Sequence, residues 1–155
     1  MTIPDLLKAF CDAVEKCEGQ RFATLFTETA TYHDVFYGDF KGRERIAAMI
    51  PDWFYKSAKD FRWDMHDPVF DGRTLYARYT FSYQSLLPEA KGARAMFEGV
   101  AIMQIEQDLI ADYREVANTA TGFIDMNFAP ERIVKILARE ARELKARPEM
   151  ARHLV

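Results

Sequence analysis

Residues 61–83 read FRWDMHDPVFDGRTLYARYTFSY, and this stretch carries the strongest fold signal in the chain. Apolar and polar side chains alternate with a period of two over residues 61–66 and again over residues 75–83. That alternation is typical of strands with one buried and one exposed face. Asp71-Gly72 between the two runs is a favoured pair for a tight hairpin turn. The stretch therefore predicts two antiparallel strands joined by a hairpin.

More strands flank this hairpin on both sides. Residues 94–105 and residues 110–117 have strand patterns and are separated by a polar turn. Upstream, residues 30–34 are expected to be extended, because β-branched Thr31 and aromatic Tyr32 favour strands. Consecutive strands joined by short turns predict an antiparallel sheet.

Helical periodicity occurs in segments that lie apart from most of the strands. Apolar residues recur at spacings of three and four over residues 5–18, and a final helix begins at Pro130. Shorter helices are expected over residues 22–26 and 43–50, whereas residues 35–42 hold two glycines and are expected to form a loop. Helices and strands segregated in this way predict an α+β fold.

Length and composition exclude several classes of protein. The 155 residues correspond to about one domain, and the 49% of hydrophobic residues exclude a disordered chain. No apolar run approaches the ~18 residues of a transmembrane helix and no signal peptide is visible, so we expect a cytoplasmic protein without membrane contact. The net charge of −3 gives no nucleic-acid-binding face, since the Lys- and Arg-rich final helix is interleaved with Glu. The 14% of aromatic residues exceeds what a minimal core needs.

Neither a disulfide nor a metal site is expected. Cys11 and Cys17 are six residues apart on one predicted helix, which separates them by ~9 Å along its axis, beyond the ~7 Å limit for a disulfide. His33, His66 and His153 show no spacing typical of metal ligands. We therefore expect reduced thiols, no metal and no cofactor.

Several short motifs share their order and spacing with one superfamily. In the first half of the chain they are Leu25-Phe26, Ala30-Thr31-x-x-Asp34, Gly38, Gly42 and Ile46. In these motifs the chain resembles the nuclear transport factor 2-like superfamily, in particular its SnoaL-like branch of polyketide cyclase and ketosteroid isomerase-like proteins. Residues 110–115, IADYRE, resemble that branch's final strand.

The resemblance covers about residues 5–120. We accordingly expect a cone domain over residues 1–125 and a helical extension over residues 126–155 packed on it. The family implies a curved antiparallel sheet wrapped over the N-terminal helices in the shape of a cone. It also implies an apolar pocket inside the cone and a homodimer. A shared fold does not determine the function, because members of the superfamily range from isomerases to structural dioxygenase subunits.

Asp34 is the leading catalytic candidate that the resemblance implies. In ketosteroid isomerase-like members the matching aspartate is the general base. Tyr32 has the same strand parity as Asp34, so both side chains project to one face. A carboxylate at the mouth of an apolar cavity has a raised pKa, which suits proton transfer near neutral pH. The alternative is a structural role in which Asp34 caps the loop of residues 35–42.

The donors that bind the oxyanion in ketosteroid isomerase-like enzymes are missing. Phe10 stands where those enzymes carry a tyrosine, and Ala101 stands near the position of their protonated aspartate. Each lost donor costs ~2.7–4 kcal/mol of transition-state stabilisation. Classical ketosteroid isomerisation is therefore not expected.

Epoxide-hydrolase-like members provide a second comparison. Tyr32, Asp34, Arg78 and Glu115 fall on positions that match the polar residues of those enzymes, whereas Thr80 replaces their general acid. Arg78 either reaches a ligand oxygen or pairs with Glu115 across the sheet, and both alternatives stay open.

These observations predict a small hydrophobic ligand and a cofactor-independent isomerase or cyclase with Asp34 as general base. Two alternatives remain: a non-catalytic ligand-binding or interaction module of the same fold, and an epoxide-hydrolase-like enzyme without the usual general acid. The catalytic candidates are Asp34, Tyr32, Arg78 and Glu115. The predicted ligand-binding residues are Phe10, Tyr32, Trp53, Trp63, Phe97, Met103 and Tyr113.

Overall fold

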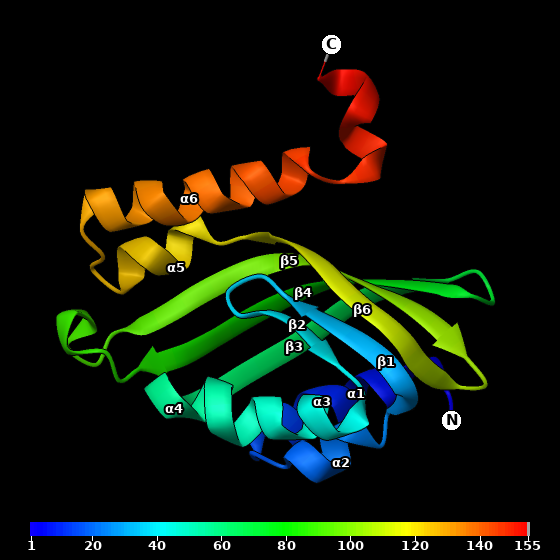
Figure 1. The fold of residues 1–155 in the computed structure, drawn as a ribbon. Coiled ribbons are helices and arrows are strands. Elements are labelled where there is room, and N and C mark those ends of the chain that lie inside the picture. The colour runs from blue at the N-terminus through cyan, green and yellow to red at the C-terminus, as the bar shows by residue number, and fades with distance from the viewer. Residues whose placement is uncertain (155) are drawn as a thin grey trace.

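Six strands form one curved sheet in the order β2-β1-β6-β5-β4-β3 (Figure 1). The structure is a computed structural model that describes residues 1–154. The strands are β1 Phe26–Asp34, β2 Gly38–Lys41, β3 Ala58–Phe70, β4 Thr74–Ser85, β5 Arg94–Glu106 and β6 Leu109–Asn118.

The predicted hairpin is present as β3 and β4. Trp63 pairs with Phe81 in register. The turn is held by Asp71, whose Oδ1 accepts hydrogen bonds from the backbone N–H groups of Arg73 at 2.8 Å and Thr74 at 2.6 Å. Along β4, odd-numbered residues from Leu75 to Tyr79 are buried and the even-numbered residues between them are exposed. The alternation in the sequence therefore identified the inner face of the sheet correctly.

Two irregularities in β3 bend the sheet. The register with β4 shifts between Lys59 and Arg62 and again between His66 and Val69. Such bulges increase the local bend and twist of a strand. They help to wrap β3 and β4 around the helices rather than leaving the sheet flat.

The sheet differs from the prediction at its other edge. It is not wholly antiparallel, because β1 runs parallel to β6 and pairs Tyr32 with Tyr113. Residues 35–42, expected to form a loop, contain the short strand β2, which pairs with β1 in a hairpin. Gly38 and Gly42 both have φ of +85°, so they mark the two ends of β2 rather than a continuous loop.

Helices lie on both sides of the sheet (Figure 1). The N-terminal helices pack below the sheet in this view, and α5 and α6 lie above it. None of the helices in residues 1–154 is long and apolar enough to span a membrane. The helices are α1 Ile3–Glu15, α2 Gly19–Ala23, α3 Arg43–Met49, a π-helical turn Ile50–Phe54, α4 Tyr55–Ser57, α5 Ala120–Asp125 and α6 Pro130–Lys145.

The main core lies between α1 and the inner face of the sheet. Phe10 of α1 is fully buried, and its ring centroid lies 5.1 Å from that of Trp63 and 5.4 Å from that of Tyr113. Burying a large apolar side chain contributes ~1.5–3 kcal/mol. Much of the aromatic content is therefore core material.

A second apolar cluster lies where α5 meets β5. It contains Phe97 and Phe123, and Ile133 and Ile136 of α6 pack against it. Gly122 makes this close approach feasible, because a Cβ there would lie 2.0 Å from Cζ of Phe97. The C-terminal helix is thus attached to the body of the protein through its first half.

Candidate functional site

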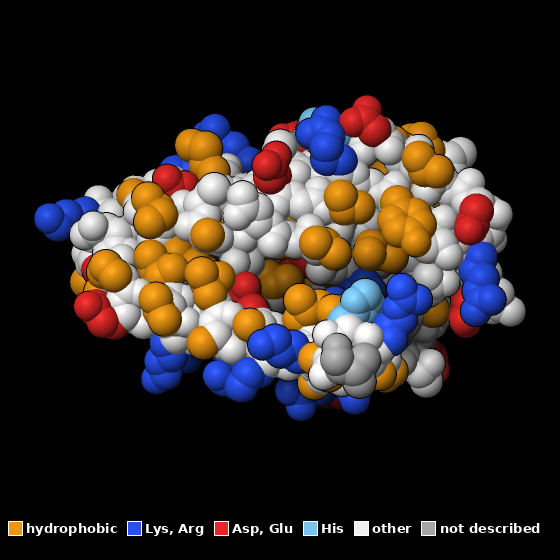
Figure 2. All heavy atoms as spheres, turned by 90° about the horizontal axis from the view of Figure 1, so that it is seen from above, with side chains coloured by type: hydrophobic (Ala, Val, Ile, Leu, Met, Phe, Trp, Pro, Cys, Tyr) orange, Lys and Arg blue, Asp and Glu red, His pale blue; other side chains and the backbone are white. Residues whose placement is uncertain are grey.

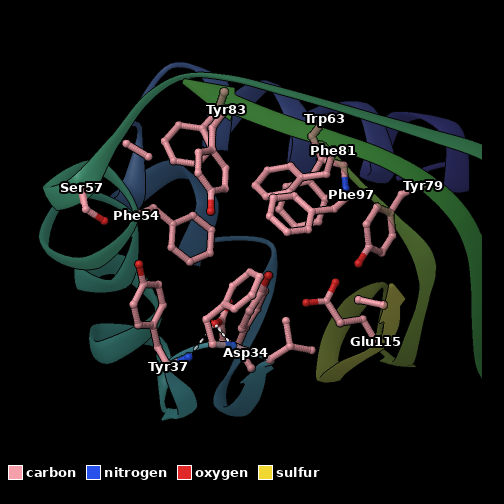
Figure 3. Close-up of a pocket in the computed structure, with 16 residues that line it drawn as sticks. Asp34, Tyr37, Phe54, Ser57, Trp63, Tyr79, Phe81, Tyr83, Phe97 and Glu115 are labelled. Carbon is pink, nitrogen blue, oxygen red and sulfur yellow. Dashed lines mark hydrogen bonds between the residues drawn. The ribbon is translucent and has the colours of Figure 1, made fainter. Parts of the chain in front are cut away.

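A pocket lies between the inner face of the sheet and the segment that follows α3 (Figure 3). Its cavity volume is about 40 Å³, room for a few water molecules. The residues that line it are Tyr32, Asp34, Val35, Phe36, Tyr37, Phe54, Ser57, Ala58, Phe61, Trp63, Tyr79, Phe81, Tyr83, Phe97, Glu115 and Ala117.

Strand alternation brings the functional groups of the pocket together. Tyr32 and Asp34 are two residues apart on β1, and Tyr79 lies on the inner face of β4. Glu115 comes from β6, next to β1 in the sheet. Because side chains two residues apart share a face, these strands present their polar groups to one cavity.

Asp34 has both a structural contact and an atom left for other chemistry. Its Oδ1 accepts hydrogen bonds from the backbone N–H groups of Phe36 at 2.8 Å and Tyr37 at 2.9 Å, which hold the loop after β1 (Figure 3). Within residues 1–154 no group donates a hydrogen bond to Oδ2. The proposed loop-capping role is therefore compatible with a catalytic one.

Burial raises the pKa of Asp34 to about 6. The two backbone hydrogen bonds oppose that shift, and so does the positive charge of Arg139. At neutral pH this carboxyl is mostly ionised and is a stronger base than an exposed aspartate. These are the properties that a general base requires.

Glu115 is a second carboxyl in the same pocket. Burial, followed by the negative charge of Asp34, raises its pKa to about 7, and hydrogen bonding by Tyr79 and Tyr113 opposes the shift. The Tyr113 hydroxyl donates to Oε2 of Glu115 at 3.1 Å. About half of the Glu115 side chains carry a proton near pH 7, so this residue is able to donate one while Asp34 accepts one.

One buried donor in the pocket has no hydrogen-bond partner in the described chain. It is Nε1 of Trp63. Trp63 lines the pocket and is only 4% exposed. Buried polar groups in native proteins are rarely left unpaired.

Five of the residues predicted for the site line the pocket: Tyr32, Asp34, Trp63, Phe97 and Glu115. Three others do not, because they are buried deeper in the core: Phe10, Met103 and Tyr113. Of these, Tyr113 reaches the site indirectly, through its hydrogen bond to Glu115.

Arg78 lies outside the pocket, which corrects its predicted role. Its Nε and Nη2 donate to Oδ2 of Asp67 at 3.2 and 3.1 Å on the outer face of the sheet. It makes no ion pair with Glu115, because Ala77 and Tyr79 on either side of it point inward. Thr80 is exposed on the same outer face.

Trp53 also lies outside the pocket. It belongs to the π-helical turn and is 43% exposed. Its ring packs against Phe40 and Tyr37, with both centroid distances at 5.5 Å. Its connection to the pocket is indirect, because it packs against Tyr37, which lines the pocket.

Two kinds of pocket residue were missing from the sequence prediction. Tyr79 and Tyr83 could have been found, since the alternation of β4 places both on the inner face that Arg78 does not share. Tyr37 and Ser57 had no comparable signal, because they lie in a turn and a one-turn helix whose positions depend on the folded chain.

The described chain contains no group of three or more His, Cys, Asp or Glu side chains arranged to hold a metal ion. Cys11 and Cys17 are free thiols. His33 lies on the other face of β1 from Asp34, where its ring nitrogens are 2.7 Å from Asp39 and 2.9 Å from Asp112.

A family model described as a SnoaL-like domain matches residues 7–113. No curated protein matches the sequence.

Solved structures share the fold at low sequence identity. TsrD from Streptomyces laurentii is 19% identical with a TM-score of 0.69, over 82% of this chain and 96% of that one. A protein with a ketosteroid isomerase-like fold from Catenulispora acidiphila, in complex with trimethylamine, is 15% identical with a TM-score of 0.70, over 83% and 100%. An LEH-like epoxide hydrolase from M. tuberculosis is 15% identical with a TM-score of 0.63, over 88% and 94%.

Proposed function

This chain belongs to the SnoaL-like domain family, and from that premise we propose that it binds a small hydrophobic molecule and transforms it by cofactor-independent acid–base chemistry. One observation carries the proposal: two carboxyl groups with raised and different pKa values, Asp34 and Glu115, line one aromatic pocket. Pairs of titratable groups whose surroundings separate their pKa values are typical of acid–base sites. The small cavity favours a slim ligand over a large polycyclic one.

The chemistry follows from the protonation states. Ionised Asp34 takes a proton from a carbon of the ligand, and the electron pair of that C–H bond moves into the ligand. Protonated Glu115 gives its proton to the atom that gains electron density, so the ligand stays neutral. When Asp34 returns the first proton to a different carbon and Glu115 takes its own proton back from the ligand, the isomerisation is complete and both carboxyl groups are restored.

We test this proposal with hydrogen exchange in D₂O on two small carbon acids, 1-indanone and indene, followed by proton NMR. The wild-type protein is expected to accelerate exchange at the acidic carbon of at least one of them. Asp34→Asn should lower that rate by about 100-fold or more, because general base catalysis typically contributes ~10²–10⁴. Asp67→Asn changes an exposed carboxylate on the outer face and serves as the matched control.

The pH dependence gives the proposal a second check. Catalysis needs Asp34 ionised and Glu115 protonated, so the rate should rise through about pH 6 and fall through about pH 7. Glu115→Gln should remove the fall at high pH. A wild-type rate equal to that of buffer for both compounds would rule out acid–base catalysis on such carbon acids.

The strongest alternative is a ligand-binding module without catalysis. It is supported by the two backbone N–H groups that bond Oδ1 of Asp34, which give this residue a purely structural reason to be present. In that case both compounds bind, neither exchanges faster than in buffer, and Asp34→Asn leaves their affinity unchanged. The epoxide-hydrolase alternative gains no support from Arg78 and Thr80, since both face away from the pocket.

A further inference from the structure

We infer that Tyr79 is a positioning residue for Glu115, and that Gly99 is the gap in β5 through which the Tyr79 hydroxyl reaches that carboxyl. The inference rests on the proposed function, because it concerns the residue proposed there as the proton donor. It goes further by naming the side chain that holds the donor in place and the position on the neighbouring strand that admits this side chain.

Strand β5 lies between the two residues in the sheet. Tyr79 belongs to β4 and Glu115 to β6, and β5 pairs with both of these strands. In register, Tyr79 is opposite Gly99, whereas Glu115 is opposite Ala101. Both side chains line the pocket on the inner face. The Tyr79 side chain therefore reaches Glu115 by lying across the inner face of β5.

The inner face of β5 is low at this crossing, where Gly99 and Ala101 follow one another. A Cβ at Gly99 would lie 2.6 Å from the hydroxyl oxygen of Tyr79 and 2.7 Å from its Cζ. Both distances are shorter than carbon atoms of neighbouring side chains tolerate, since well-packed carbon atoms lie about 3.5–4.0 Å apart. The end of the Tyr79 ring thus occupies the space that a side chain at position 99 would fill.

Close approach is the reason for glycine at position 99. Gly99 does not have a positive φ, so its backbone conformation alone does not call for glycine. Glycine inside a strand weakens the strand and often marks a place where another group approaches closely. Two groups do so here: the Tyr79 ring, and the carbonyl oxygen of Val116, which would lie 2.5 Å from a Cβ at Gly99.

The contacts of Tyr79 direct its hydroxyl at Glu115. Tyr79 is 2% exposed, and its ring centroid lies 5.7 Å from that of Trp63 with the planes inclined by 62°. The hydroxyl points toward the Glu115 carboxyl and hydrogen-bonds to it (Figure 3). Tyr113, on the same strand as Glu115, donates to Oε2 at 3.1 Å. Two hydroxyls from different strands thus hold one carboxyl and limit its rotation.

These hydrogen bonds also influence the acidity of Glu115. A hydroxyl that donates to a carboxylate stabilises the charged form, so Tyr79 opposes the rise in pKa that burial and the charge of Asp34 cause. Burial, followed by the charge of Glu115, raises the pKa of Tyr79, so its hydroxyl keeps its proton at neutral pH and stays a donor. Without this donor, Glu115 would release its proton less readily near pH 7.

The titration of Glu115 tests the inference without any ligand. Tyr79→Phe keeps the ring and removes the hydroxyl. The midpoint of the Glu115 carboxyl ¹³C signal should therefore rise from about 7 to about 8, as expected for the loss of one hydrogen bond to a charged group. Tyr83→Phe is the matched control, because Tyr83 also lines the pocket from β4 but its hydroxyl donates to Sδ of Met126 at 3.7 Å. The control should leave the Glu115 midpoint near 7.

Gly99→Ala tests the gap. The added methyl group should displace the Tyr79 hydroxyl and raise the Glu115 midpoint as Tyr79→Phe does, and combining the two substitutions should give no further rise. The methyl group also crowds the carbonyl oxygen of Val116. If Gly99→Ala fails to fold, judged by the ¹⁵N–¹H spectrum, the same substitution should fold in Tyr79→Leu, where the ring is withdrawn. Failure there too would assign the glycine to Val116 alone and overturn the role of the gap.

The exchange profile in D₂O links the titration to the proposed chemistry. In Tyr79→Phe, the fall of the rate at high pH should move upward together with the Glu115 midpoint, whereas a residue that only stabilises the fold would not move it. A Glu115 midpoint that stays near 7 in Tyr79→Phe would show that the positioning role is wrong. If wild type exchanges neither carbon acid faster than buffer, the proposed function is wrong, and the titration of Glu115 still decides this inference.

Discussion

Asp34 and Glu115 lower the stability of the protein at the pH where we expect them to act. Their folded-state pKa values, about 6 and about 7, lie above the ordinary values of 3.8 and 4.5. A group whose pKa is raised by folding contributes its stability below the unfolded pKa and loses it as the pH rises through the folded pKa. The free energy of unfolding therefore falls as the pH rises from about 4 to about 7, and the full loss remains above pH 7.

Replacing either carboxyl with an amide should stabilise the protein at pH 8. One pKa unit corresponds to ~1.4 kcal/mol, so removing the buried charge of Asp34 should raise the free energy of unfolding by about 3 kcal/mol. Urea unfolding of Asp34→Asn and of Glu115→Gln, compared with wild type at pH 4 and pH 8, measures the effect.

The gain should disappear at pH 4, where both carboxyls are protonated in wild type. Asp67→Asn is again the control, because the exposed carboxylate should give little change at either pH. If both amide variants are instead less stable than wild type at pH 8, the charged carboxyls stabilise the folded protein, and the expectation is wrong.

For single residues, the sequence predicts which side chains face inward better than it predicts their roles. Alternation along β4 places Tyr79 inside and Arg78 outside, as the structure has them. The resemblance to epoxide-hydrolase-like members nevertheless made Arg78 a catalytic candidate, because it falls on a matching position. An arginine next to a catalytic position suggests chemistry, but a single step along a strand moves a side chain to the opposite face.

Among the elements, α6 bears directly on the site although it comes after the matched family domain. Arg139 of α6 lies over the loop that Asp34 holds, with Nη2 at 3.5 Å from the carbonyl oxygen of Val35 and 3.4 Å from that of Phe36. Its positive charge lowers the pKa of Asp34 and so offsets part of the effect of burial. The C-terminal helix α6 thus influences the pKa of Asp34 on β1.

Arg139→Gln should raise the pKa of Asp34 above about 6. The carboxyl ¹³C signal of Asp34, titrated by NMR, should move to a higher midpoint, and the acid limb of any exchange profile should move with it. Arg142→Gln removes a charge from an exposed position on the same helix and should shift neither. If the titration midpoint of Asp34 is the same in wild type and in Arg139→Gln, α6 does not influence the pKa of Asp34.

Elements with a strong local pattern were predictable, and those that depend on tertiary contacts were not. The β3–β4 hairpin has both alternation and a turn motif, so its position follows from the sequence. Strand β2 has four residues between two glycines, which conceals it within an apparent loop. The parallel pairing of β1 with β6 has no local signal at all, because it joins segments about eighty residues apart.

For the molecule as a whole, part of the outer face of the sheet is left exposed. Val100 and Val116 pair in register on the outer faces of β5 and β6, and both are exposed, Val116 by 63%. Met96 and Tyr76 are exposed on the same side of the sheet. Figure 2 looks onto the α6 side, where hydrophobic side chains lie among charged ones on both sides of a central hollow. Adjacent exposed apolar side chains on a sheet are typical of a protein–protein contact.

We propose that a second copy of the chain covers this surface to form a homodimer. Light scattering after size exclusion should give twice the chain mass of 18.0 kDa. Val116→Asp places a charge in the apolar part of the contact and should weaken dimerisation at least about tenfold, as substitutions at central contact positions do. Ile124→Asp alters an equally exposed residue on α5 and should leave the dimer intact. A wild-type mass of one chain at every concentration would refute the dimer, whereas a Val116→Asp dimer as tight as wild type would move the contact away from the sheet.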